Sequence, residues 1–139
     1  MSTELRQYER LGAGYTVALR LTGIKQSDKK ASITSLSQGG LCFVSTLDLV
    51  QGDRLEIDLP PDRPLLTLKA RVTWCRPQRD KFSAGVEFVE MSDTRRARIF
   101  EMHKAIVAYQ QMNNPSGDAQ QAAVEWLQRY ADKFFAGAP

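Results

Sequence analysis

The stretch "LLTLKARVTWCRPQRDKFSAGVEFV", residues 65–89, contains two runs of alternating apolar and polar residues that a charged turn separates. In each run the apolar side chains share one parity, namely Leu66, Leu68, Ala70, Val72 and Trp74, then Phe82, Ala84, Val86 and Phe88. Strict period-two alternation is typical of antiparallel strands that have one face on a core and one in water. The stretch therefore predicts a β-hairpin, and its parity directs Trp74 toward the core.

The same alternation recurs in the residues before this hairpin. It runs through residues 15–22 and 54–60, and two shorter apolar runs occupy residues 30–35 and 40–45. Segments rich in Gly, Pro, Asp and other polar residues separate the runs. Six short strands with one apolar face must curl or close in order to hide that face and their edges. We therefore expect a mainly β fold, a six-stranded antiparallel barrel over residues 15–91.

The pattern changes to helical spacing at Ser92, and it predicts a C-terminal helical extension over residues 92–139. Asp93 is the expected N-cap of a first helix, and a second helix is expected from Asp118 to Phe135. Their apolar faces are expected at Ile99, Met102, Ile106 and Tyr109, and at Ala123, Leu127, Tyr130 and Phe134. Two interpretations stay open. The helices cap an open end of the barrel, or the aromatic-rich stretch 125–135 forms a homo-oligomer or partner surface.

Composition excludes several classes of function. The chain has 139 residues and a net charge of +3, which suits an anionic ligand but also an ordinary solvated surface. Cys42 and Cys75 lack zinc-ligand spacing, and His103 is the single histidine, so we expect no metal and no enzymatic activity. No run is long enough to span a bilayer, and the polar start is unlike a signal peptide, so we expect a cytoplasmic protein.

Two segments have residue types suited to binding a nucleotide. Arg6 and Arg10 stand four residues apart in "RQYER", and guanidinium groups can grip phosphate or a guanine edge bidentately. In "SLSQGG", residues 35–40, hydroxyls and glycine amides can be approached closely by a ligand. The alternatives are solvated charges for the arginines, and serines that bond to their own turn.

Together these segments resemble the signature of the PilZ domain, a bacterial receptor for cyclic di-GMP. The signature pairs RxxxR with a later (D/N)xSxxG. Arg6 and Arg10 match the first motif, Ser37 and Gly40 match the second, and Ser35 stands where the motif has Asp or Asn. The stretches "GDRLEIDL", "ARVTWCR" and "SAGVEFV" follow in the family's order, so the resemblance covers about residues 6–90.

The resemblance implies that cyclic di-GMP lies on the barrel surface. Arg6 and Arg10 would hold guanine and phosphate, Ser37 would bond to the ligand, and Gly40 would permit the turn. Trp74 would then be a stacking platform instead of a core residue. Binding would order a flexible arginine segment, residues 1–14, and relay the signal to an unidentified protein partner that controls motility, biofilm or virulence.

Two alternative functions stand beside this one. Ser35 is shorter than Asp and uncharged, so it is expected to weaken binding by roughly tenfold to a hundredfold. The alternative is therefore a PilZ-like adaptor that binds no nucleotide and acts through protein contacts, for example in type IV pilus function. A reader of DNA or RNA is disfavoured, because the strands lack a platform that combines aromatic and basic residues.

Overall fold

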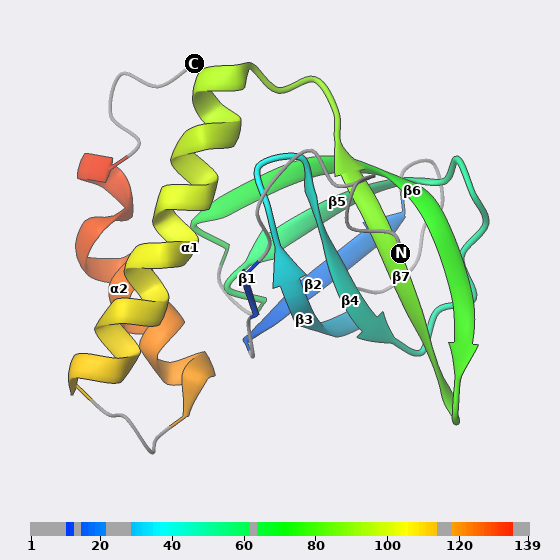
Figure 1. Ribbon diagram of the computed structural model, residues 1–139, viewed down its shortest axis with the longest axis horizontal. Coiled ribbons are helices and arrows are strands. Elements are labelled where there is room, and N and C mark those ends of the chain that lie inside the picture. Colours follow the sequence, from blue (N-terminus) through cyan, green and yellow to red (C-terminus); the bar gives the residue numbers. More distant parts are fainter. Residues whose placement is uncertain (1–10, 13–14, 22–28, 62–63, 114–117, 135–139) are drawn as a thin grey trace.

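The computed structural model describes residues 11–12, 15–21, 29–61, 64–113 and 118–134, which form a β-barrel with two helices beside it (Figure 1). The strands are β1 (Leu11–Gly12), β2 (Thr16–Leu21), β3 (Lys29–Leu36), β4 (Gly40–Ser45), β5 (Arg54–Leu59), β6 (Leu66–Gln78) and β7 (Lys81–Phe88). The helices are α1 (Asp93–Asn113) and α2 (Ala119–Phe134).

The barrel is closed and antiparallel throughout. Its strand order is β3-β2-β5-β6-β7-β4, and β4 pairs with β3 to complete the ring. The six-stranded barrel followed by two helices is thus confirmed. The expected arginine segment contains the additional strand β1, which pairs with the end of β3. A two-residue strand is too short to show a period in the sequence.

The barrel core follows the predicted parity along most strands. Leu55, Ile57 and Leu59 of β5 point inward beside Leu66, Leu68, Ala70 and Val72 of β6, and all are buried. The largest fully buried side chains are Phe43, Phe88, Leu19, Ile33, Leu36, Leu41, Leu55, Ile57, Leu59, Leu68, Ile99 and Met102. Since Ile99 and Met102 belong to α1, the helix and the barrel share one core.

The two helices begin with hydrogen-bonded caps, one of which differs from the prediction. The Ser92 hydroxyl accepts from the backbone N–H of Arg95 at 3.1 Å, so Ser92 is the N-cap of α1 and Asp93 its first residue. Asp118 caps α2 as predicted, because its carboxylate accepts from the N–H of Gln120 at 2.9 Å. Among the described residues, no helix has the length and apolar character needed to cross a membrane.

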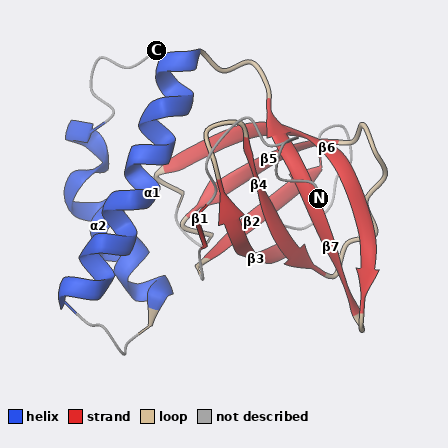
Figure 2. Cartoon of the chain, in the orientation of Figure 1, coloured by secondary structure: helices blue, strands red, loops and turns tan. Residues whose placement is uncertain are grey.

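The helices lie side by side next to the barrel, on the side where β1 lies (Figures 1 and 2). Polar contacts join them to the start of β2. The hydroxyl of Tyr15 and Nδ1 of His103 lie 2.8 Å apart, and the Thr16 hydroxyl donates to Oε1 of Gln120 at 2.7 Å. Both α1 and α2 are therefore anchored to one short piece of the chain, Tyr15–Thr16.

The aromatic residues of α2 are divided between core and surface. Trp126 is only 6% exposed and packs in the common core with Leu127, whereas Tyr130, expected on the inward face, is 42% exposed. The inward face of α2 is instead completed by Ala131. The helices thus extend the core of this chain, while the homo-oligomer surface stays a prediction.

Candidate functional site

The segment Ser35–Gly40 contains the end of β3, the start of β4 and the tight hydrogen-bonded turn between them, residues 37–39. The N–H of Ser37 donates to the carbonyl of Gly40 at 2.9 Å, and the Ser37 hydroxyl accepts from the N–H of Gly39 at 3.2 Å. The Ser37 side chain is 3% exposed and also lies 3.4 Å from the Gly40 carbonyl. Ser37 therefore holds the shape of the turn, and a bond from Ser37 to a ligand stays a prediction.

Gly40 is required by a close approach of two strands. A Cβ at this position would lie 1.9 Å from the carbonyl oxygen of Val86 on β7. The backbones of β4 and β7 can therefore meet here only because residue 40 has no side chain. Gly40 was expected to permit the turn, and the structure adds a second requirement, the contact of its backbone with the Val86 carbonyl on the neighbouring strand.

Four residues form a line across the outer surface of the barrel, and we call them the outer row: Ser35, Cys42, Gly85 and Trp74. Ser35 pairs with Cys42, Cys42 with Gly85, and Gly85 with Trp74. The row thus crosses β3, β4, β7 and β6 in turn. It brings two of the predicted site residues, Ser35 and Trp74, onto one surface.

Two β-bulges turn the ends of the outer row outward. The pairing of β3 with β4 shifts register between Ile33 and Ser35, and that of β6 with β7 shifts between Val72 and Trp74. One extra residue in a strand reverses the parity of everything that follows. The prediction that Trp74 shares the inward face of Val72 is therefore wrong, and Cys75 packs against the core instead.

The indole of Trp74 lies over Gly85 and leaves no room for a side chain there. A Cβ at residue 85 would lie 2.2 Å from Nε1 and 2.6 Å from Cε2 of Trp74. The guanidinium carbon of Arg76 lies 4.4 Å from the centroid of the same ring, which is a cation–π contact. Trp74 is half-buried, so this stack forms a raised aromatic and cationic edge to the row.

Strand β1 borders the other end of the row. Gly12 pairs with Ser35, and Leu11 pairs with Leu36. Leu11 follows Arg10 directly in the chain. Arg6 and Arg10 themselves lie outside the described residues.

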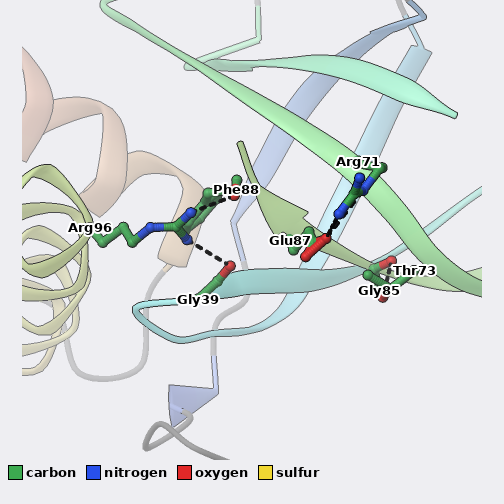
Figure 3. A network of polar contacts seen from close by, with 7 residues as sticks. All are labelled: Gly39, Arg71, Thr73, Gly85, Glu87, Phe88 and Arg96. Carbon is green, nitrogen blue, oxygen red and sulfur yellow. Dashed lines mark hydrogen bonds and ion pairs between the residues drawn. The ribbon is translucent and has the colours of Figure 1, made fainter. Parts of the chain in front are cut away.

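A network of polar contacts surrounds the turn and the row (Figure 3). Arg71 of β6 forms an ion pair with Glu87 of β7, the residue that pairs with Gly40 across the two strands. The guanidinium of Arg96, on α1, donates to the carbonyls of Gly39 at 3.3 Å and of Phe88 at 2.7 Å. Sequence reasoning missed Arg96, because it is one of three arginines in "RRAR" and nothing local distinguishes it.

Two ionisable groups with shifted pKa values, Asp58 and Tyr15, lie on β5 and directly before β2, which the outer row does not cross. Burial tends to raise the pKa of Asp58, but hydrogen bonds from Arg20 at 2.8 Å and from the Thr67 hydroxyl at 2.7 Å outweigh it and hold that pKa low. Burial raises the pKa of Tyr15 well above its ordinary value, so its hydroxyl stays protonated. Within the described part of the chain, no three His, Cys, Asp or Glu side chains gather as a potential metal site.

Comparisons with known proteins agree with this architecture. The model of the PilZ domain family matches residues 4–103. The fold is similar to that of the PilZ domain with c-di-GMP of YcgR from Escherichia coli, with a TM-score of 0.56 and 16% identity over 78% of this chain and 98% of that one.

Two longer solved proteins have the same fold over about half of their length. One is the inhibitor of motility MotI/DgrA from Bacillus subtilis, with a TM-score of 0.53 and 21% identity over 78% of this chain and 52% of that one. The other is YcgR in complex with c-di-GMP from Escherichia coli, with a TM-score of 0.55 and 18% identity over 79% and 48%. No curated protein sequence matches the chain.

At such low identities the solved structures support the fold, while the family match rests on the sequence. That match spans the arginine pair, the turn at Ser35–Gly40 and the whole barrel. This chain therefore belongs to the PilZ domain family.

Proposed function

We propose that this chain is a non-enzymatic receptor for cyclic di-GMP, which it binds along the outer row. The observation that supports this most strongly is the pairing of β1 with β3. Leu11 and Gly12, which directly follow the arginine pair in the chain, lie beside Leu36 and Ser35 at the edge of the row. We propose that the two halves of the family signature meet on this surface.

The dimensions of the chain are compatible with this arrangement. From Ser35 to Trp74 the row crosses three strand intervals, or about 14 Å at a strand spacing of about 4.8 Å. Arg6 precedes Leu11 by five residues, and an extended chain of that length spans up to about 18 Å. Arg6 can therefore reach a ligand anywhere along the row, whereas Arg10, directly before Leu11, would reach only the end of the row near Ser35.

Each part of the row has chemistry that suits a cyclic dinucleotide. Cys42 is small and only partly buried, so a flat base or a ribose can approach the sheet closely there, whereas Trp74 covers Gly85. The Arg76 guanidinium already covers the Trp74 ring, so a guanine would stack on this guanidinium or take its place on the indole. Arg6 and Arg10 would supply positive charge to the phosphates and bidentate donors to a guanine edge.

We further propose that the signal passes to a protein partner in the cytoplasm and that the output is motility control. One structural neighbour is named as an inhibitor of motility, and two others are described with c-di-GMP bound. The ligand would be bound and released chemically unchanged. Its binding would act by altering the protein surface that is available to the partner.

Isothermal titration of the purified chain with cyclic di-GMP tests the proposal. We expect saturable binding, and a rise in Kd of roughly tenfold or more for Arg6→Ala and for Arg10→Ala, since each loses charge-assisted contacts. Arg129→Ala, on α2, removes the same charge far along the chain and is the matched control. Absence of heat at high micromolar ligand would show that the proposal is wrong.

A second candidate function rests on Ser35. In place of the Asp or Asn of the family signature, this position at the edge of the row has a short neutral hydroxyl. The chain would then be an adaptor that acts through protein contacts alone. Titration of Ser35→Asp distinguishes the two: a large gain in affinity indicates a weakened but working site, and no binding by either protein favours the adaptor.

A further inference from the structure

We propose that Arg96 is a positioning residue for the Ser37–Gly40 turn and that it couples this turn to helix α1. The inference rests on the proposed function, because the turn matters as part of the cyclic di-GMP site. It adds a residue that lies outside the two signature motifs and sits on the helical extension.

The geometry around Arg96 is a closed cycle of three hydrogen bonds. Arg96 donates from Nη1 to the Gly39 carbonyl at 3.3 Å and from Nη2 to the Phe88 carbonyl at 2.7 Å. The N–H of Phe88 donates to the same Gly39 carbonyl at 2.9 Å. One guanidinium therefore fixes the middle of the turn relative to the end of β7 (Figure 3).

The chemistry of the arginine side chain suits this role better than that of lysine. A guanidinium is planar and presents two donors in a fixed fork, so it can hold two carbonyls at a set separation. A lysine ammonium at this place would be a single point donor. Arg96 is half-buried, which limits the competition of water for these carbonyls.

The position of Arg96 on α1 links the turn to the start of a rigid element. Arg96 lies in the first turn of the helix, and its own N–H donates to the carbonyl of the capping residue Ser92 at 3.0 Å. A displacement of Gly39 by a bound nucleotide would therefore pull on the capped end of α1. By linkage, anything that shifts this helix end must also change the affinity of the turn for its ligand.

The same helix also contacts the strand that follows the arginine segment. His103 lies seven residues after Arg96, about two helical turns further on, and forms the buried contact with Tyr15. Helix α1 is thus bonded to the turn at one point and to the start of β2 at another. Substituting Arg96 would remove the contact of the helix with the turn and leave its contact with Tyr15 in place.

The test compares Arg96→Ala and Arg96→Lys with wild type and with Lys104→Ala. Lys104 lies on the same helix and pairs with Glu101 at the surface, so its removal controls for the loss of one positive charge. For each protein, the Kd for cyclic di-GMP, the urea midpoint and amide hydrogen exchange without ligand are measured. Hydrogen exchange is followed at the backbone amides of Gly39 and Phe88, and the amide of Leu68 serves as the reference in the barrel.

We expect Arg96→Ala to raise the Kd about tenfold or more, Arg96→Lys to give a smaller rise, and Lys104→Ala to give none. The amides of Gly39 and Phe88 should exchange faster in Arg96→Ala, while that of Leu68 changes little. If Arg96→Ala proves too unstable to titrate, Arg96→Lys provides the same comparison in a milder form.

Two results overturn the inference. One is a Kd for cyclic di-GMP that is the same in both Arg96 variants as in wild type. The other is amide hydrogen exchange at Gly39 and Phe88 that is no faster in Arg96→Ala than in wild type. If wild type binds no cyclic di-GMP, the proposed function is wrong, and the exchange data then decide alone whether Arg96 positions the turn. A lower urea midpoint with unchanged Kd assigns Arg96 to stability only and also contradicts the inference.

Discussion

Replacing Gly85 by alanine is expected to push the indole of Trp74 off the outer row. The added Cβ would lie 2.2 Å from Nε1 and 2.6 Å from Cε2 of Trp74. Ordinary contact between such atoms needs about 3.5 Å, so the ring must move by roughly 1 Å or more. Because Trp74 is half-buried, the ring can swing outward and the strands can keep their pairing.

The size of the effect follows from what the ring loses. Strain and lost packing over Gly85 should lower the free energy of unfolding by about 1–2 kcal/mol. If a guanine stacks on Trp74, the displaced ring also loses about 1–3 kcal/mol of binding, or roughly a fivefold to 150-fold rise in Kd. Urea unfolding measures the first quantity, and isothermal titration with cyclic di-GMP measures the second.

A double-mutant cycle with Trp74→Ala tests the reasoning behind these numbers. The three atoms nearest to the added Cβ all belong to Trp74, so truncating that ring removes the obstacle. Gly85→Ala should therefore cost less than about 0.5 kcal/mol in the Trp74→Ala background. An equal cost in both backgrounds would refute the placement of the indole over Gly85.

Three further substitutions probe the scaffold of the site. Gly40→Ala should lower the free energy of unfolding in urea by about 3 kcal/mol, because its Cβ would lie 1.9 Å from the backbone oxygen of Val86. Asp58→Asn should lower it by about 1–3 kcal/mol at pH 7, since a charge-assisted bond to Arg20 is lost. The pKa of this carboxyl is held low in the fold, so its contribution is complete above about pH 4 and declines at lower pH. Tyr15→Phe should lower the same quantity by about 1–3 kcal/mol, because a buried imidazole loses its hydroxyl partner.

Each of these expectations has a clear contrary result. A loss below about 1 kcal/mol for Gly40→Ala would mean that β4 and β7 are further apart than the structure shows. For Asp58→Asn, a stability difference that stays constant from pH 7 to pH 3 would exclude a depressed pKa. Tyr15→Phe is compared with Tyr130→Phe, whose ring is exposed, and equal losses would argue against the contact to His103.

Period-two alternation predicts six strands, and in the longer ones the buried face, because every second side chain of a half-buried strand faces the core. It fails at Trp74, which follows the extra residue Thr73, because threonine is a common strand residue that gives no sign of a bulge. The second bulge, at Thr34, is equally hidden in the sequence. Whether a strand takes up an extra residue depends on the strands that pair with it, and these lie elsewhere in the sequence.

The candidate site was predictable where it consists of short motifs and unpredictable where it depends on contacts across the fold. Ser35–Gly40 was recognised from its residue types. Gly85 was not, because its requirement for a missing side chain comes from Trp74 on another strand. Arg96 resembles its neighbours Arg95 and Arg98 in sequence, and only the approach of the turn to the helix start distinguishes it.

The contacts of the helices join the C-terminal extension to the barrel as one packed unit. A chain cut after residue 91 would lose Arg96 from the turn, and it would lose the partners of Tyr15 and Thr16 at the start of β2. It would also expose core surface that Trp126 now covers. Both the turn and the start of β2 are thus bonded to the helical pair. If cyclic di-GMP binds along the outer row and displaces the turn, as proposed, its binding and the packing of the helices would influence each other.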